Sequence, residues 1–168
     1  MVNVCVNIRY RGLSDMENCF VCERIEKIKS GTNPYFVREL ETGYVVIGDS
    51  QRIKGYTVFI CKQHATELHH LDKDTRSRFL QEMSLVAEAV YNAFKPDKLN
   101  YELIGRGNAQ HMHWHIFPRY AGDTATGGPV WHLGKELFSA EYAPTATELE
   151  ELKKKLNKEI DKLIQMNF

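Results

Sequence analysis

The sequence has no apolar run of about 18 residues, the minimum for a membrane-spanning helix, so no membrane partner is expected. It has no excess of either charge, because 22 lysines and arginines balance 22 aspartates and glutamates. A protein that coats nucleic acid needs a basic surface, so no nucleic acid polymer is expected as a partner. The N-terminus lacks the basic, apolar and cleavage regions of a signal peptide, which predicts a cytoplasmic location.

Cysteine is scarce too, with four residues, and two of them, Cys19 and Cys22, form a C-x-x-C pair. In a reducing compartment such a pair is more often a metal or redox site than a structural disulfide. It matches one half of a zinc site, but no second C-x-x-C pair follows, so a tetrahedral shell would need two further ligands. Two buried small side chains, or less readily a redox pair, are the other interpretations.

The 168 residues suit one domain, with no internal repeat. Residues 1–14 alternate apolar and polar side chains, which predicts an N-terminal arm or an edge strand. Apolar spacing predicts helices over 15–29 and 72–94, the first with Phe20, Ile25 and Ile28 pointing inward. A loop and a last helix, opened by a Thr147-x-x-Glu150 capping box, occupy 121–168 and are expected to belong to the same domain.

Strands are predicted from runs of β-branched and aromatic residues bounded by turn residues. The run GYTVFIC is strongly apolar and predicts a central strand. Short connections make the first two strands a hairpin and the last two antiparallel neighbours. The predicted strands cover residues 35–40, 44–47, 55–61, 99–104 and 111–118.

The most specific motif is a row of three histidines, His111, His113 and His115, which alternate with apolar residues before Pro118. A period of two is typical of a half-buried strand, on which alternate side chains share one face. The three imidazoles are therefore expected on one face, at steps of about 6.6 Å. Groups placed in this way can titrate, bind a metal or attack phosphorus.

From the residues alone, more than one role for this row stays open. Strict alternation argues against incidental histidines on a solvated face. The three rings could bind one catalytic metal ion, although the outer two would lie about 13 Å apart along a strand. Alternatively, one ring holds a metal and another is the nucleophile, which the C-x-x-C pair favours because it offers His111 other partners.

In this motif the chain resembles the histidine triad (HIT) family. The family signature H-φ-H-φ-H-φ-φ, with φ apolar, is matched by the seven residues from His111 to Phe117. The order of the C-x-x-C pair, a strand that leads to His64, a long helix and the triad resembles a bacterial zinc-containing branch similar to diadenosine polyphosphate hydrolases. The resemblance implies an α+β, HIT-like fold over residues 15–120, with a mostly antiparallel sheet, packed helices and a homodimer.

The resemblance also implies an activity. Family members act on nucleoside 5′-phosphate derivatives, such as dinucleoside polyphosphates and nucleoside phosphoramidates, through a covalent nucleotidyl-histidine. The implied catalytic residues are His113, the nucleophile, and His115, a donor to phosphate oxygens. The implied structural zinc ligands are Cys19, Cys22, His64 and His111, and the expected substrate contacts are Asp49, Asn108, Gln110 and His115.

Two positions depart from the family pattern. Tyr56 stands where some branches have a histidine, and residues 107–110 lack the serine or threonine that many members have before the triad. Both positions concern substrate contacts, so the nucleophile is retained while the base and leaving group stay unassigned. A nucleotide hydrolase or nucleotidyl transferase is the leading hypothesis; a phosphorylase and a zinc-stabilised nucleotide-binding protein with little turnover are the alternatives.

Overall fold

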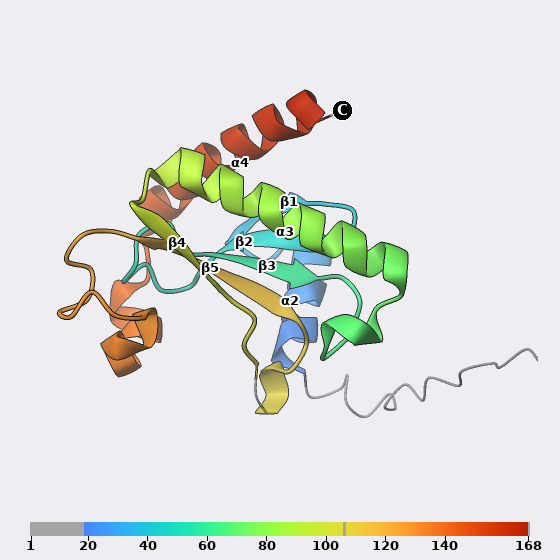
Figure 1. The fold of residues 1–168 in the computed structure, drawn as a ribbon, viewed down its shortest axis with the longest axis horizontal. Helices are drawn as coiled ribbons and strands as arrows, with labels where there is room; N and C mark the ends of the chain where they lie inside the picture. The colour runs from blue at the N-terminus through green and yellow to red at the C-terminus, as the bar shows by residue number, and fades with distance from the viewer. Residues whose placement is uncertain (1–18, 106, 168) are drawn as a thin grey trace, which may run out of the picture.

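The computed structural model describes residues 19–105 and 107–167, so the predicted N-terminal arm at 1–14 lies outside the described residues. Five strands form one sheet in the order β1-β2-β3-β5-β4, and every neighbouring pair is antiparallel (Figure 1). The α+β fold with an antiparallel sheet is therefore confirmed. The strands are β1 (Phe36–Glu39), β2 (Gly43–Ile47), β3 (Thr57–Cys61), β4 (Lys98–Glu102) and β5 (His113–Arg119).

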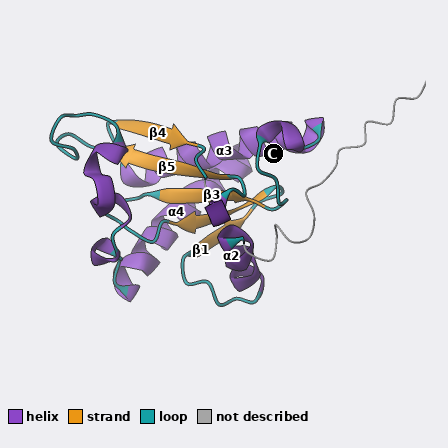
Figure 2. Cartoon of the chain, turned by 90° about the horizontal axis from the view of Figure 1, so that it is seen from below, coloured by secondary structure: helices purple, strands orange, loops and turns teal. Residues whose placement is uncertain are grey.

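In the part of the chain that the structure describes, three α-helices cover the sheet. Helices α3 (Lys73–Phe94) and α4 (Ala146–Asn167) lie on one face, and the short α2 (Phe20–Lys29) lies on the other (Figures 1 and 2). Short 3-10 segments complete the fold at Leu68–His70, Gly107–Ala109, Val130–Phe138 and Ala140–Tyr142. Within the described residues, no helix is both long and apolar enough to cross a membrane.

Alternation along the strands separates two apolar layers. Val45 and Phe59 are fully buried in the larger core, which α3 and α4 cover. Val46 and Ile60, one position further along each strand, pack with α2 in a smaller cluster. Trp114 and Ile116 of β5 belong to the larger core, so the same alternation turns the histidines of β5 toward the face that carries α2.

Two details of the helix predictions are wrong. Phe20 does not point inward but is 46 % exposed, and Val21 joins Ile25 and Ile28 on the buried face of α2. The helix α2 begins at Phe20 with Cys19 as its N-cap, and residues 15–18 of the predicted helix lie outside the described residues.

The capping box of the last helix lies two residues earlier than predicted. The backbone N–H of Thr145 donates to the Glu148 carboxylate, and the Glu148 N–H donates to the Thr145 hydroxyl. Two T-x-x-E patterns overlap here, and the helix starts at Ala146 because its apolar face already begins at Leu149. Glu150 instead pairs with Lys153. The helix packs on α3 through Leu149, Leu152, Leu156, Ile160 and Leu163, as its apolar spacing predicts.

Candidate active site and metal centre

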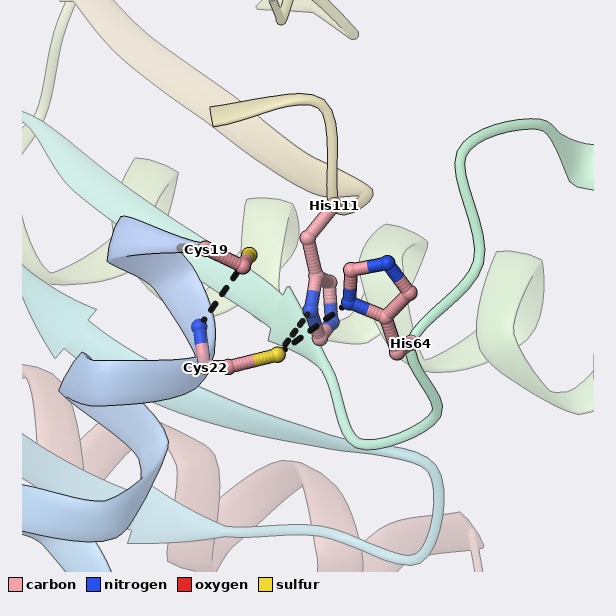
Figure 3. A group of neighbouring side chains, drawn as sticks. All are labelled: Cys19, Cys22, His64 and His111. Carbon is pink, nitrogen blue, oxygen red and sulfur yellow. Dashed lines mark hydrogen bonds between the residues drawn. The ribbon is translucent and has the colours of Figure 1, made fainter. Parts of the chain in front are cut away.

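Four side chains from three distant segments meet beside the N-terminus of α2 (Figure 3). Cys19 is the N-cap of α2, and its Sγ accepts a hydrogen bond from the Cys22 N–H. The Cys22 Sγ lies 3.1 Å from the His64 Nδ1 and 3.3 Å from the His111 Nδ1. The ligand atoms of all four side chains lie within 4.8 Å of one another, so the structure brings together the four residues predicted to bind a metal.

The expectation that His111 lies in the triad strand is wrong, because β5 begins at His113. The backbone of Met112 pairs with Ala65 and Cys61, at the end of β3 and the segment after it. The ring of His111 is thereby directed toward the cysteines, and its Nε2–H donates to the Cys61 carbonyl at 2.7 Å. Its Nδ1 lone pair then faces the cluster, which is how an outer hydrogen bond orients a metal-binding imidazole.

The protonation chemistry of the cluster suits a cation. Burial lowers the pKa of His111 to about 4, so its ring is neutral, the form that binds a metal. Burial, and after it a hydrogen bond with Cys19, raises the pKa of the Cys22 thiol to about 12. Such a thiol becomes a thiolate at neutral pH only beside a cation. Two thiols and two imidazoles fit the tetrahedral shell of a structural zinc site, which leaves no open position.

His113 is held in one tautomer by the backbone. Its Nδ1–H donates to the His111 carbonyl at 2.7 Å, which leaves the Nε2 lone pair unprotonated. Burial lowers the pKa of His113, so the ring is neutral at pH 7. A neutral imidazole with a free Nε2 at the wall of a pocket can attack an electrophile.

His115 is held by a tyrosine. The Tyr56 hydroxyl lies 2.5 Å from the His115 Nδ1, and the two rings are stacked. Burial raises the pKa of Tyr56 above its usual range and lowers that of His115 to about 3, so the hydroxyl donates to a neutral ring. A hydrogen bond with the backbone of Ile104 acts in the other direction and raises the pKa of His115. The ring centroids of His113 and His115 are 4.6 Å apart, so both can reach one phosphate group.

A pocket opens over these two histidines on the face that carries α2. One part of the lining comes from the N-terminal half of α2, and another is Phe138 of the 130–138 segment, whose ring lies beside Tyr56 and His115. The floor is the aliphatic surface of β2 and β3. The lining side chains that carry polar chemistry are Arg24, Asp49, Ser50, Tyr56, His113 and His115.

Comparison with known proteins agrees with this geometry. A family model described as HIT domain matches residues 34–122. The chain belongs to the HIT domain family. "Protein hit" of Bacillus subtilis is 30 % identical over 131 residues, which cover 74 % of this chain and 86 % of that protein.

HIT proteins of known structure share the fold. A histidine triad protein from Bradyrhizobium japonicum is 26 % identical, with a TM-score of 0.65, over 74 % of this chain and 89 % of its own. A zinc-bound histidine triad family protein from Mycobacterium smegmatis is 22 % identical, with a TM-score of 0.61, over 90 % of this chain and 99 % of its own. At 22 % identity, the likeness to the Mycobacterium smegmatis protein shows a shared fold alone.

The structure places some of the residues predicted to contact substrate in the pocket lining and leaves others outside it. Asp49 lines the pocket with His113 and His115. Asn108 and Gln110 are exposed, and Ala109 between them forms that part of the wall.

Sequence reasoning missed several lining residues. Phe20 and Arg24 are four residues apart on α2, so helical spacing from the C-x-x-C pair could have placed both on one face. Phe138 carries no such signal, because only the folded chain brings the 130–138 segment to β5.

Proposed function

We propose that this HIT protein is a nucleotide hydrolase or nucleotidyl transferase that attacks the α-phosphate of a nucleoside 5′-phosphate derivative through His113. The observation that carries the proposal is the hydrogen bond from the His113 Nδ1–H to the His111 carbonyl, which frees Nε2 at the pocket wall. The substrates proposed are dinucleoside polyphosphates and nucleoside phosphoramidates.

The chemistry has two steps. The Nε2 lone pair forms a bond to the α-phosphorus while the bond to the leaving group breaks, which gives a nucleotidyl-imidazole. Water then attacks the same phosphorus, releases the nucleoside monophosphate and returns the neutral ring. His115 would donate from its second ring nitrogen to a phosphate oxygen, in place of its bond to the Ile104 backbone, while Tyr56 holds the first nitrogen.

We propose that the cluster of Cys19, Cys22, His64 and His111 holds one structural zinc ion. When bound, the ion would supply a link between α2, the segment after β3 and the segment that precedes β5. Its closed shell has no position for substrate, so its part in turnover would be to hold the α2 wall of the pocket in place.

The proposed assembly is a homodimer. Among the residues that the structure describes, β4 is an edge strand of the sheet, bonded only to β5, and Tyr101 and Ile104 near that edge are 46 % and 45 % exposed. Paired edges of two copies would cover both the unpaired backbone groups and these side chains.

Incubation with diadenosine polyphosphates and adenosine 5′-phosphoramidate, followed by product identification, tests the function. We expect AMP as a product, and His113→Ala should remove turnover while nucleotide binding survives. His69→Ala is the matched control, since His69 is exposed and lies outside the pocket lining. A fully active His113→Ala variant would refute the mechanism. Tight binding without turnover would favour the binding-protein alternative, and ADP formed only with added phosphate would favour the phosphorylase.

A further inference from the structure

An exposed aromatic ring stands beside His115 in the pocket lining. Phe138, the last residue of the 130–138 segment, is 55 % exposed and lines the pocket. Its ring centroid lies 6.1 Å from the ring centroids of both Tyr56 and His115, at tilts of 60° and 58°. The ring therefore leans on two aromatic side chains of the site and keeps more than half of the residue's surface exposed next to the proposed reaction centre.

The segment around Phe138 is anchored, so the fold sets the position of the ring. Leu137 is buried in one apolar cluster with Tyr56. The Glu136 carboxylate forms an ion pair with Arg52. A single exposed apolar side chain is ordinary on a protein surface, whereas an aromatic ring held in the lining of a pocket is typical of a ligand contact.

The register of β3 and β5 divides the pocket lining along the strands. His113 pairs with Ile60, which packs in the apolar cluster that α2 covers. His115 pairs with Val58, two residues away along β3, a step of about 6.6 Å. The ring centroids are 4.6 Å apart from His113 to His115 and 6.1 Å apart from His115 to Phe138. The aliphatic lining under α2 therefore adjoins His113, whereas the ring of Phe138 adjoins His115.

This division suits a substrate with two bases. In the proposed reaction, the nucleotide that becomes attached to His113 would place its base against the aliphatic lining under α2. A dinucleoside polyphosphate carries a second nucleoside on its leaving group, joined to the attacked phosphorus through further phosphates. Those phosphates would pass His115, the proposed donor, and the base behind them can then reach Phe138. Stacking on an aromatic ring is favourable for every base, because each base has a π face.

We infer that Phe138 forms a subsite for the base of the leaving nucleoside, so that the pocket favours dinucleoside polyphosphates over nucleotides whose leaving group has no aromatic ring. This inference rests on the proposed function and selects one of its two substrate classes. With diadenosine tetraphosphate, His113 Nε2 bonds to the α-phosphorus while the bond to the bridging oxygen breaks, which releases ATP from the Phe138 side. Water then releases AMP from His113.

The experiment compares diadenosine tetraphosphate with adenosine 5′-tetraphosphate that carries a methyl ester on its terminal phosphate. The two compounds have the same charge and the same bond to break, but the ester has no second base. The measured quantity is the ratio of kcat/KM, halved for the two equivalent ends of diadenosine tetraphosphate. The variants are Phe138→Ala, Phe138→Leu and Phe138→Trp. Trp131→Ala is the matched control, because Trp131 is 51 % exposed on the same segment but lies outside the pocket lining. Calorimetry gives the affinity for AMP, and thermal melts report folding of each variant.

Wild type and Trp131→Ala are expected to prefer diadenosine tetraphosphate by about tenfold or more, the effect of stacking one base. Phe138→Ala and Phe138→Leu should lose most of that ratio at unchanged affinity for AMP, and Phe138→Trp should keep it.

No preference in wild type, or a wild-type ratio in Phe138→Ala, overturns the inference while the proposed function stands. An equal loss for both compounds together with weaker binding of AMP would place the transferred base on Phe138, which also overturns it. If wild type binds nucleotides without turnover, the ratio of its affinities for the two compounds decides the inference alone. Absence of both binding and turnover refutes the inference and the proposed function together.

Discussion

Replacement of Cys22 by alanine tests how the metal cluster supports the pocket. Cys22 lies between His64 and His111, so its loss would remove the sulfur that contacts both imidazoles. Val21, Ile25 and Ile28 of α2 would still pack against the sheet. A helix of 10 residues is too short to be stable alone, so α2 depends on these contacts and on the cluster.

The size of the effect follows from those contacts. Three aliphatic side chains contribute about 1.5–3 kcal/mol each when buried, so complete undocking of α2 costs at most about 5–9 kcal/mol. We expect Cys22→Ala to lower the free energy of unfolding by about 3–5 kcal/mol, with a drop in melting temperature of about 10 °C. Denaturant titration and metal analysis measure the two effects, with about one zinc per wild-type chain and none in the variant.

The same substitution separates a structural metal from a catalytic one. α2 supplies Phe20, Val21 and Arg24 to the pocket, whereas His113 lies on β5. We therefore expect KM to rise while kcat changes little. Cys61→Ala is the control, because Cys61 is a fully buried thiol of the main core outside the cluster and should lose some stability but keep its zinc. Retained zinc in Cys22→Ala, or a loss of kcat at unchanged KM, would refute the reasoning.

Two further predictions concern single hydrogen-bonded pairs. Tyr56→Phe leaves the buried Nδ1 of His115 without its hydrogen-bond donor, so kcat in steady-state assays should fall by about ten- to a hundredfold. An unchanged kcat would show that the hydroxyl does not orient His115. Arg119 lowers the pKa of Asp123, so this carboxylate adds stability above its ordinary pKa of 3.8 and loses it as the pH falls through the lowered value. Asp123→Asn should therefore be less stable than wild type at pH 7 and nearly as stable as wild type in strong acid. Thermal melts at several pH values measure this difference, and a loss of stability of the same size at every pH would contradict the prediction.

The strand pattern and the meeting of Cys19, Cys22, His64 and His111 in one cluster were predictable, the first from alternation along the chain and the second from the family's order of motifs. Strict alternation placed Trp114 and Ile116 in the core and turned His113 and His115 to the other face. The family order of motifs then brought Cys19 and His64 toward the same strand end. These predictions needed the type and order of residues and no knowledge of packing.

The parts that failed depend on contacts between distant segments. His111 leaves the strand because Met112 pairs with Ala65, a residue of another segment. The pairing of Arg24 with Asp49 joins residues 25 positions apart, and neither has a distinctive neighbourhood in the sequence. Phe138 reaches the pocket through a segment whose turns give no signal of where it docks.

The most direct test of the central claim is mass spectrometry of the wild-type protein after rapid acid-free quenching during turnover of adenosine 5′-phosphoramidate. The account predicts a covalent adenylyl group on the chain, which peptide mapping locates on the imidazole of His113, and no such adduct on His113→Ala. An adduct on another residue, or turnover at full rate with none on His113, would contradict it.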